Sequence, residues 1–183
     1  MSEVDVLLER YTTLASLAWT ADLSGAERVW FVVYSPAQER RMLLRSTDFE
    51  AATRGAGHGW VQLDLSDSFA YWMAAHEFRE EYFSEPEFAD TILPEFAEHL
   101  ARQVKAALGT AETDTVVALC GLSSLFGLAS VSELVNAVRN SIRGRLLVFF
   151  PGEKEGSNYR FLDARDGWNY LSIAITANEV ASP

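Results

Sequence analysis

The chain has little of several residue types that mark well-known functional classes. Its 183 residues include a single cysteine, Cys120, so no intrachain disulfide can form and a reducing, cytosolic compartment is favoured. No apolar run approaches the roughly 20 residues that a membrane-spanning helix needs. The charged N-terminus also lacks the basic region and apolar core of a signal peptide. We therefore expect a cytoplasmic protein in which Cys120 is a small buried core residue.

Basic residues are scarce as well. The chain has 15 Lys and Arg against 26 Asp and Glu, a net charge of −11. Such a balance opposes sequence-independent binding to nucleic acid, where cations must replace the counterions of the phosphates. It equally opposes attraction to an anionic membrane surface. We expect neither partner, and a protein partner instead.

Apolar residues nevertheless make up 49% of the chain, which is typical of a globular protein. Three apolar runs and one alternating segment predict strands, and the segments between them have the three- and four-residue spacing of amphipathic helices. The predicted strands are 28–34, 60–65, 115–120 and 145–150, and the predicted helices are 3–18, 35–54, 68–78, 94–108 and 131–142. This alternation predicts an α/β fold with three layers, in which a mainly parallel sheet is flanked by helices. The alternating segment 60–65 is expected near a sheet edge.

The C-terminal part departs from this alternation. The strand 145–150 is expected to end at Pro151-Gly152, and the segments 159–163 and 169–175 have no helix between them. Because a short connection cannot join parallel neighbours, these two segments are predicted to pair as an antiparallel hairpin on the sheet. We expect one α/β domain over residues 1–183, with an N-terminal helix 1–20, a strand–helix core 27–151, a hairpin extension 152–176 and a tail 177–183.

Nucleotide binding is the first enzyme class to test, since this fold class commonly hosts it. The loop after the first strand reads Ser35-Pro-Ala-Gln-Glu39, without the glycines and lysine that cradle phosphates. The glycine-rich stretch 55–59 precedes a strand, whereas a dinucleotide-binding motif follows one. A nucleotide-binding or nucleotide-cleaving protein with a degenerate phosphate loop stays open as the alternative function, because polar residues lie at the strand ends.

Hydrolase and metal motifs are also incomplete. Ser123 and Ser124 follow a glycine at a strand-to-helix turn, as in a nucleophile elbow, but Leu125 replaces the second glycine and no histidine follows His99. The three histidines are scattered and there is no cysteine pair, so we expect no metal site. Magnesium bound by carboxylates alone stays open at three acidic residues, Glu153, Asp163 and Asp166. We expect no cofactor and no enzymatic activity.

The segment 76–99 combines acidic and aromatic residues. It contains eight acidic residues, and Arg79 is its only Lys or Arg. Bulky aromatic side chains among carboxylates are typical of a docking surface for a basic partner, for which the candidates are Phe78, Tyr82, Phe83 and Phe88. The alternative, which the sequence favours, is a helix–loop–helix crossover with acidic faces in solvent and aromatic side chains packed inward.

The stretch 146–175 holds the most distinctive polar residues. Because it follows a buried strand, it is expected at the carboxyl end of the sheet, where α/β folds bind ligands. The residues of this candidate binding site or structural signature are Pro151, Gly152, Glu153, Asn158, Tyr159, Arg160, Asp163, Arg165, Asp166, Asn169 and Tyr170. In the structural interpretation, the glycines form turns, the arginines pair with nearby carboxylates and the aromatic residues complete the core.

Four segments together resemble the BrxB family of bacterial BREX phage-defence systems. They read ERVWFVVYSPAQERR, GHGW, VVALCGLSSLFGLASVSELV and LLVFFPGEKEGSNYRFLDARDGWNYL, and they span nearly the whole chain. The last is the most specific, and its matching positions are Phe150, Pro151, Gly152, Asn158, Tyr159, Arg160, Asn169 and Tyr170.

The resemblance implies a small cytoplasmic component of a multi-protein antiviral island. The Rossmann-like fold is predicted separately, from the alternation of strands and helices. The implied neighbours are a methyltransferase, a large ATPase and an alkaline-phosphatase-like protein, the last being the first expected partner. The family has no established catalytic residues to transfer to this chain. The sequence therefore predicts an accessory, non-catalytic interaction protein, with self-association as a further possibility.

Overall fold

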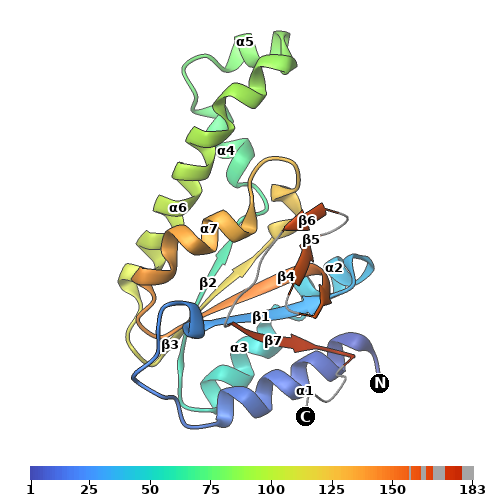
Figure 1. The fold of residues 1–183 in the computed structure, drawn as a ribbon, viewed down its shortest axis with the longest axis vertical. Helices are drawn as coiled ribbons and strands as arrows, with labels where there is room; N and C mark the ends of the chain where they lie inside the picture. The colour runs from blue at the N-terminus through green and yellow to red at the C-terminus, as the bar shows by residue number, and fades with distance from the viewer. Residues whose placement is uncertain (157, 162–163, 167–171, 179–183) are drawn as a thin grey trace.

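The computed structural model describes residues 1–156, 158–161, 164–166 and 172–178 (Figure 1). Its centre is a parallel sheet in the order β2-β3-β4-β1-β7. The strands are β1 (Val29–Tyr34), β2 (Gly59–Asp64), β3 (Thr115–Cys120), β4 (Arg145–Glu155) and β7 (Ile173–Thr176). Every residue of β1 and β3 is buried, whereas β2 alternates and lies at the edge, as its sequence predicts.

Helices cover both faces of the sheet. The helices α1 (Glu3–Ser16), α2 (Glu39–Leu44) and α3 (Ser46–Gly55) pack on one face, and α6 (Leu93–Thr110) and α7 (Val131–Val138) pack on the other. Consecutive side chains of β1 point to opposite faces of the sheet, since Phe31 belongs to the core beneath α6 and α7 and Val32 to the core beneath α1 and α3. The predicted three-layer, Rossmann-like α/β fold is therefore confirmed.

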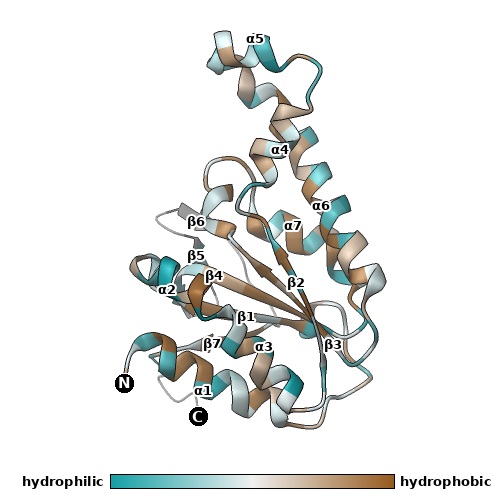
Figure 2. Ribbon diagram, turned by 180° about the vertical axis from the view of Figure 1, so that it is seen from behind, coloured by the Kyte–Doolittle hydropathy of each residue, from teal (hydrophilic) through white to brown (hydrophobic). Residues whose placement is uncertain are grey.

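Short 3-10 turns connect these elements: η1 (Ala26–Arg28), η2 (Pro36–Gln38), η4 (Leu122–Leu125) and η5 (Arg139–Ser141). Figure 2 shows the hydrophobic residues concentrated along the sheet strands, with hydrophilic residues on the outward sides of the helices. Within the described part of the chain, no helix is both long enough and apolar enough to cross a membrane.

The antiparallel extension forms from different strands than the sequence predicts. β4 does not end at Pro151-Gly152 but continues to Glu155, where it pairs with β5 (Asn158–Phe161), which in turn pairs with β6 (Ala164–Asp166). Pro151 is tolerated because it stands opposite Tyr34, the last residue of the β1 ladder, so few ladder bonds are lost. A hairpin therefore leaves the sheet through β4 itself.

The predicted pairing of segment 169–175 with segment 159–163 is wrong for the described residues. β7 instead lies parallel to β1, with Trp30 opposite Ile173 and Val33 opposite Thr176. This register buries Ile175 in the core beneath α1, which an antiparallel partner outside the sheet would not do. Burial of the apolar segment at the open edge of β1 outweighs the preference for antiparallel pairing that the short connection suggests.

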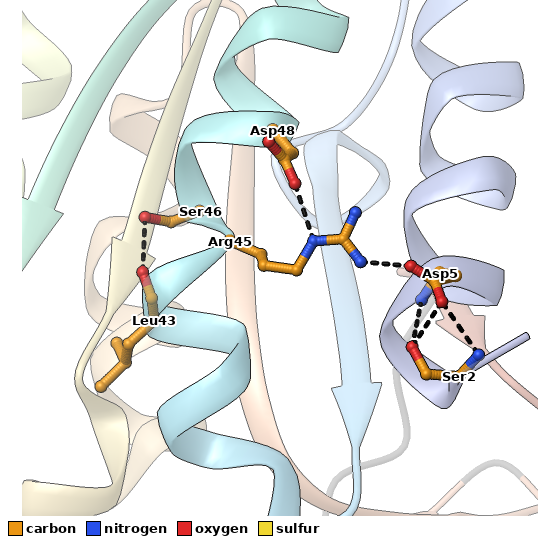
Figure 3. Close-up of polar contacts among 6 residues, drawn as sticks. All are labelled: Ser2, Asp5, Leu43, Arg45, Ser46 and Asp48. Carbon is orange, nitrogen blue, oxygen red and sulfur yellow. Dashed lines mark hydrogen bonds and ion pairs between the residues drawn. The ribbon is translucent and has the colours of Figure 1, made fainter.

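The single helix predicted over 35–54 is divided at Arg45. This residue ends α2 and precedes α3 with φ −102° and ψ 9°, outside the helical range. Its guanidinium donates to Asp5 of α1 and to Asp48 of α3, at 2.7 Å for the latter, and Ser46 donates to the Leu43 carbonyl at 3.0 Å (Figure 3). Arg45 therefore links α1 and α3 at the point where the predicted single helix is interrupted.

Between β2 and the buried part of α6, the chain forms a projection that we call the arm, residues 68–99. It contains α4 (Ser68–Ala74), α5 (Arg79–Ser84), η3 (Pro86–Ile92) and the first two turns of α6. Figure 1 shows α5 at the far end of the molecule's long axis, well away from the sheet. The predicted helix 68–78 is correspondingly shorter, because the chain turns after Ala74.

Candidate functional site

The carboxyl ends of β1 and β3 are linked through the side chain of Glu39, the first residue of α2. Tyr34, which ends β1, donates its hydroxyl to Glu39 Oε2 at 2.5 Å, and Ser123 of η4 donates to Glu39 Oε1 at 3.0 Å. Burial raises the pKa of Tyr34 above its usual value, and the neighbouring Glu39 carboxylate raises it further. Both oxygens of Glu39 thus accept hydrogen bonds from within the fold.

A second carboxylate lies at the end of β2. Asp64 Oδ1 accepts from the backbone N–H and the hydroxyl of Ser66, at 2.9 and 2.6 Å. Gly121, at the end of β3, has φ +72°, and a Cβ there would lie 2.2 Å from Ser66 Oγ, so this turn packs tightly against β3. Glu39 and Asp64 put negative charge where a phosphate would need backbone N–H donors and cations, which disfavours anionic ligands at this edge.

Two residues that the motif search considered, Ser124 and Cys120, have structural roles at this edge of the sheet. Ser124, of the incomplete nucleophile elbow, donates to the carbonyls of Gly121 and Leu65 at 2.7 and 3.2 Å. Cys120 is 1% exposed, as predicted for a core residue, and burial together with the Asp64 charge raises the pKa of its thiol to about 12. The thiol therefore stays protonated near neutral pH and is a poor nucleophile. Among the described residues, no three His, Cys, Asp or Glu side chains gather as a metal site would require.

The described residues of the C-terminal signature have roles in packing and in the β4–β5 hairpin. Tyr159 is 2% exposed and its ring lies 4.8 Å from that of Phe31 and 5.8 Å from that of Phe150. Arg160 pairs with Glu155 at 3.2 Å across the hairpin. Pro151 and Gly152 are buried in β4, while Glu153 and Asn158 are exposed on the hairpin.

Of the five remaining signature residues, the structure describes the backbone of two. The backbone of Arg165 and Asp166 lies in β6, opposite Arg160 and Tyr159 of β5. Asp163, Asn169 and Tyr170 lie outside the described residues. The hypothesis of a carboxylate-bound magnesium at Glu153, Asp163 and Asp166 therefore stays a prediction.

An aromatic cluster holds the base of the arm. The rings of Phe69 and Trp72, on α4, lie 5.0 and 5.3 Å from the ring of Phe96, which is fully buried on α6. His76 extends this cluster through edge-to-face contacts, since its ring lies 5.2 Å from that of Trp72 and 5.3 Å from that of Tyr82 of α5. Such contacts between rings at 4.5–7 Å stabilise a fixed geometry. The arm is thus a packed structure and not a loose loop.

A groove opens between α5 and η3 at the tip of the arm. It has a volume of about 410 Å³ and is lined by Phe78, Glu81, Tyr82, Glu85, Phe88 and Thr91. Three of the four aromatic residues singled out in the sequence line it. The fourth, Phe83, is on α5 but does not line the groove. The structure therefore brings Phe78, Tyr82 and Phe88 together with two carboxylates.

The aromatic side chains of the tip are exposed to solvent. Phe78, Phe83 and Phe88 are 51%, 67% and 50% exposed, whereas Tyr82 is half-buried beside His76. The inward packing that the sequence favoured holds for Phe96 and is wrong for these three phenylalanines. The reason is geometric, because the tip projects beyond the layers of the fold, where no other described element covers it.

The sequence search missed Glu81, Glu85 and Thr91 as groove residues and His76 as the residue that positions the tip. A helical-spacing test over this segment would have found part of the set. Phe78 and Tyr82 are four residues apart, as are Glu81 and Glu85, so each pair lies on one side of a helix. The contribution of η3 could not be found this way, since its placement depends on the turn at Pro86.

Comparisons of the chain with protein-family models, with curated proteins and with solved structures gave no match.

Proposed function

We propose that this protein is a non-catalytic interaction component of a BREX-type antiviral defence system. It binds another component of that system, the alkaline-phosphatase-like protein or the ATPase, through the tip of the arm. The alkaline-phosphatase-like protein is the first partner to test, and the cytoplasm is the proposed location. Support for the BREX assignment comes from the sequence resemblance.

The observation that supports an interaction function most directly is the exposed aromatic surface of the arm. Of the nine large hydrophobic side chains that are exposed among the described residues, four lie between positions 71 and 88: Tyr71, Phe78, Phe83 and Phe88. Contiguous exposed apolar surface, rimmed by polar residues, is typical of a protein–protein contact. Exposed phenylalanines on an ordered projection contribute little to folding, so a partner accounts for their presence.

The geometry of the arm agrees with this function. A projecting helix pair, fixed at its base by the ring contacts of Trp72, can enter a partner's concave surface without a large change of shape. The carboxylates of the tip steer association with a basic protein surface and oppose association with nucleic acid.

Co-purification from cells that express the whole defence island tests the proposal. A tagged wild-type protein should retain the partner in low salt, and a Phe78→Ser, Phe88→Ser double variant should lose it. Phe83→Ser is the control, because it removes an exposed phenylalanine of the same arm that does not line the groove. Recovery of the wild-type protein alone, or equal recovery of the partner with the double variant, would contradict the proposal. Equal melting temperatures of the variants would show that their folds are intact.

A further inference from the structure

The groove at the tip of the arm has two kinds of wall. Phe78, Tyr82 and Phe88 provide aromatic faces, and Glu81 and Glu85 place two carboxylates one helical turn apart. Among the described residues, no Lys, Arg or His forms an ion pair with either glutamate, while the adjacent Arg79 pairs with Glu80 at 3.4 Å and donates to the Ala74 carbonyl at 2.7 Å. The carboxylates of the groove are thus available to a cation from outside.

We propose that this groove receives an arginine-bearing segment of the partner protein. A guanidinium group lies against the aromatic walls and donates to the carboxylates of Glu81 and Glu85. This inference rests on the proposed function, because it names the chemistry of the segment that the arm binds.

Charge complementarity indicates that the ligand of the groove carries a positive charge. The segment 76–99 holds eight acidic residues and a single arginine, which is already paired with Glu80. An incoming acidic or neutral segment would leave Glu81 and Glu85 without a counter-charge as the groove loses water, which opposes binding. A basic segment neutralises both carboxylates as water leaves.

The aromatic walls favour arginine over lysine. A guanidinium is planar, stacks on aromatic rings and donates in a fork that two carboxylate oxygens can accept, whereas an ammonium is compact and more strongly hydrated. The volume of about 410 Å³ falls in the range of pockets that enclose small ligands, so the groove accommodates one or two side chains rather than a whole helix.

Short fluorescent peptides provide the probe. The first has two arginines separated by a leucine and flanked by glycines, and in the others lysine or uncharged citrulline replaces arginine. The full-length protein should bind the arginine peptide saturably in a fluorescence-anisotropy titration at low salt. The lysine peptide should bind several-fold more weakly, and the citrulline peptide should lose most of its affinity. Equal binding of the arginine and citrulline peptides, or no binding of either, would overturn the inference.

Variants of the protein separate the groove from the general acidity of the arm. Glu81→Gln and Glu85→Gln should each weaken binding of the arginine peptide about threefold, as expected for partly exposed ion pairs. Glu80→Gln removes the same charge from the same helix outside the groove and should change the affinity less than twofold. An equal effect of Glu80→Gln and Glu81→Gln would show that only the overall charge matters and would contradict the groove as the binding site.

The two proposals fail in different ways. In one outcome, the island partner binds the wild type but not the Phe78→Ser, Phe88→Ser double variant, and it still binds a Glu81→Gln, Glu85→Gln double variant normally. The arm is then the docking site, and the arginine inference is wrong. If no partner is recovered from the island while the arginine peptide binds the groove, the defence-system function fails and the ligand chemistry stands. Concentration-dependent light scattering that disappears with the glutamate variants would identify a second copy as the occupant and would overturn the inference.

Discussion

His76 Nδ1 accepts a hydrogen bond from the backbone N–H of Phe78, at 3.2 Å. The bond fixes the turn between α4 and α5, and thereby the direction in which the first aromatic wall of the groove points. On its other side, His76 Nε2 lies 3.9 Å from Glu95 Oε2 of α6. One half-buried imidazole therefore connects α4, α5 and α6 at the base of the tip.

His76→Ala should loosen the tip while it leaves the sheet intact. The variant loses one hydrogen bond, worth about 1 kcal/mol, and the ring contacts with Trp72 and Tyr82. Hydrogen exchange should accelerate for the amides of residues 78–92 and stay close to wild type in β1, β3 and β4. His76→Asn, whose amide oxygen can replace Nδ1 as acceptor, should show a smaller increase. Unchanged protection of residues 78–92 in His76→Ala would contradict this role.

The ion pair between Asp5 and Arg45 predicts a pH-dependent contribution to stability. Hydrogen bonds from the side chain of Ser2 and from Arg45 hold the pKa of the Asp5 carboxyl far below its usual value (Figure 3). A carboxyl whose pKa is lower in the folded than in the unfolded protein stabilises the fold above the unfolded pKa of about 3.9. This stabilisation decreases as the pH falls below that value.

Asp5→Asn should therefore lower the urea midpoint at pH 7 and should differ less from the wild type as the pH is lowered from about 4 toward 2. Added salt should shrink the difference at pH 7, because the pair is partly exposed. Asp22→Asn, which removes an exposed carboxylate from the loop after α1, is the control and should change the midpoint little. A difference between Asp5→Asn and wild type that is constant from pH 7 to pH 2 would exclude the proposed linkage.

The close approach of Gly152 to β5 predicts opposite effects for two glycine substitutions. A Cβ at Gly152 would lie 2.0 Å from the Arg160 carbonyl oxygen, whereas a Cβ at Gly109, inside α6, meets no atom within 4 Å. Gly152→Ala should destabilise the protein by on the order of 1–3 kcal/mol through forced movement of the hairpin. Gly109→Ala should stabilise it by about 0.5–1 kcal/mol, because alanine is the better helix former. Urea unfolding at one pH measures both changes in the free energy of unfolding. A Gly152→Ala variant as stable as the wild type would refute the tight contact between Gly152 and β5.

The elements that the sequence predicted correctly are those whose local pattern agrees with their burial. The runs at 29–34 and 115–120 are apolar on both faces because helices cover both faces, and the alternating run at 59–64 lies at an edge. For such segments, the hydrophobic periodicity of the sequence directly reflects which faces of the strand are buried in the fold. The layers of the fold could therefore be derived before the structure.

The errors occur where a non-local interaction decides the outcome. Nothing local to Ile175 indicates that it pairs beside β1. Arg45 is a good helix former, yet α2 ends at this residue, whose guanidinium binds Asp5, forty positions earlier. The exposure of Phe78 and Phe88 likewise depends on the direction of the arm, which follows from the ring contacts of Trp72 with Phe96 and His76. The composition of the candidate site was thus predictable, and its geometry was not.

The carboxylates at the strand ends predict the response to nucleotides. In a nucleotide-binding α/β protein, the loop after the first strand offers N–H donors and a lysine to the phosphates. Here Glu39 begins the helix at that place, fixed by Tyr34 and Ser123, and Asp64 adds a second negative charge at the end of β2. Repulsion and the lack of cationic donors in this loop should prevent phosphate from approaching.

Thermal unfolding with millimolar ATP, GTP or their diphosphates, each with magnesium, should therefore show the same melting temperature as without nucleotide. By linkage, a ligand present at 100 times its Kd would add about 2.7 kcal/mol and raise the melting temperature by several degrees. Glu39→Gln removes one of the repelling charges and serves as the sensitised control, in which weak binding would be detected first. A saturable rise in the wild type that Asp163→Ala abolishes would support a nucleotide site in the C-terminal segment and displace the interaction function as the first proposal.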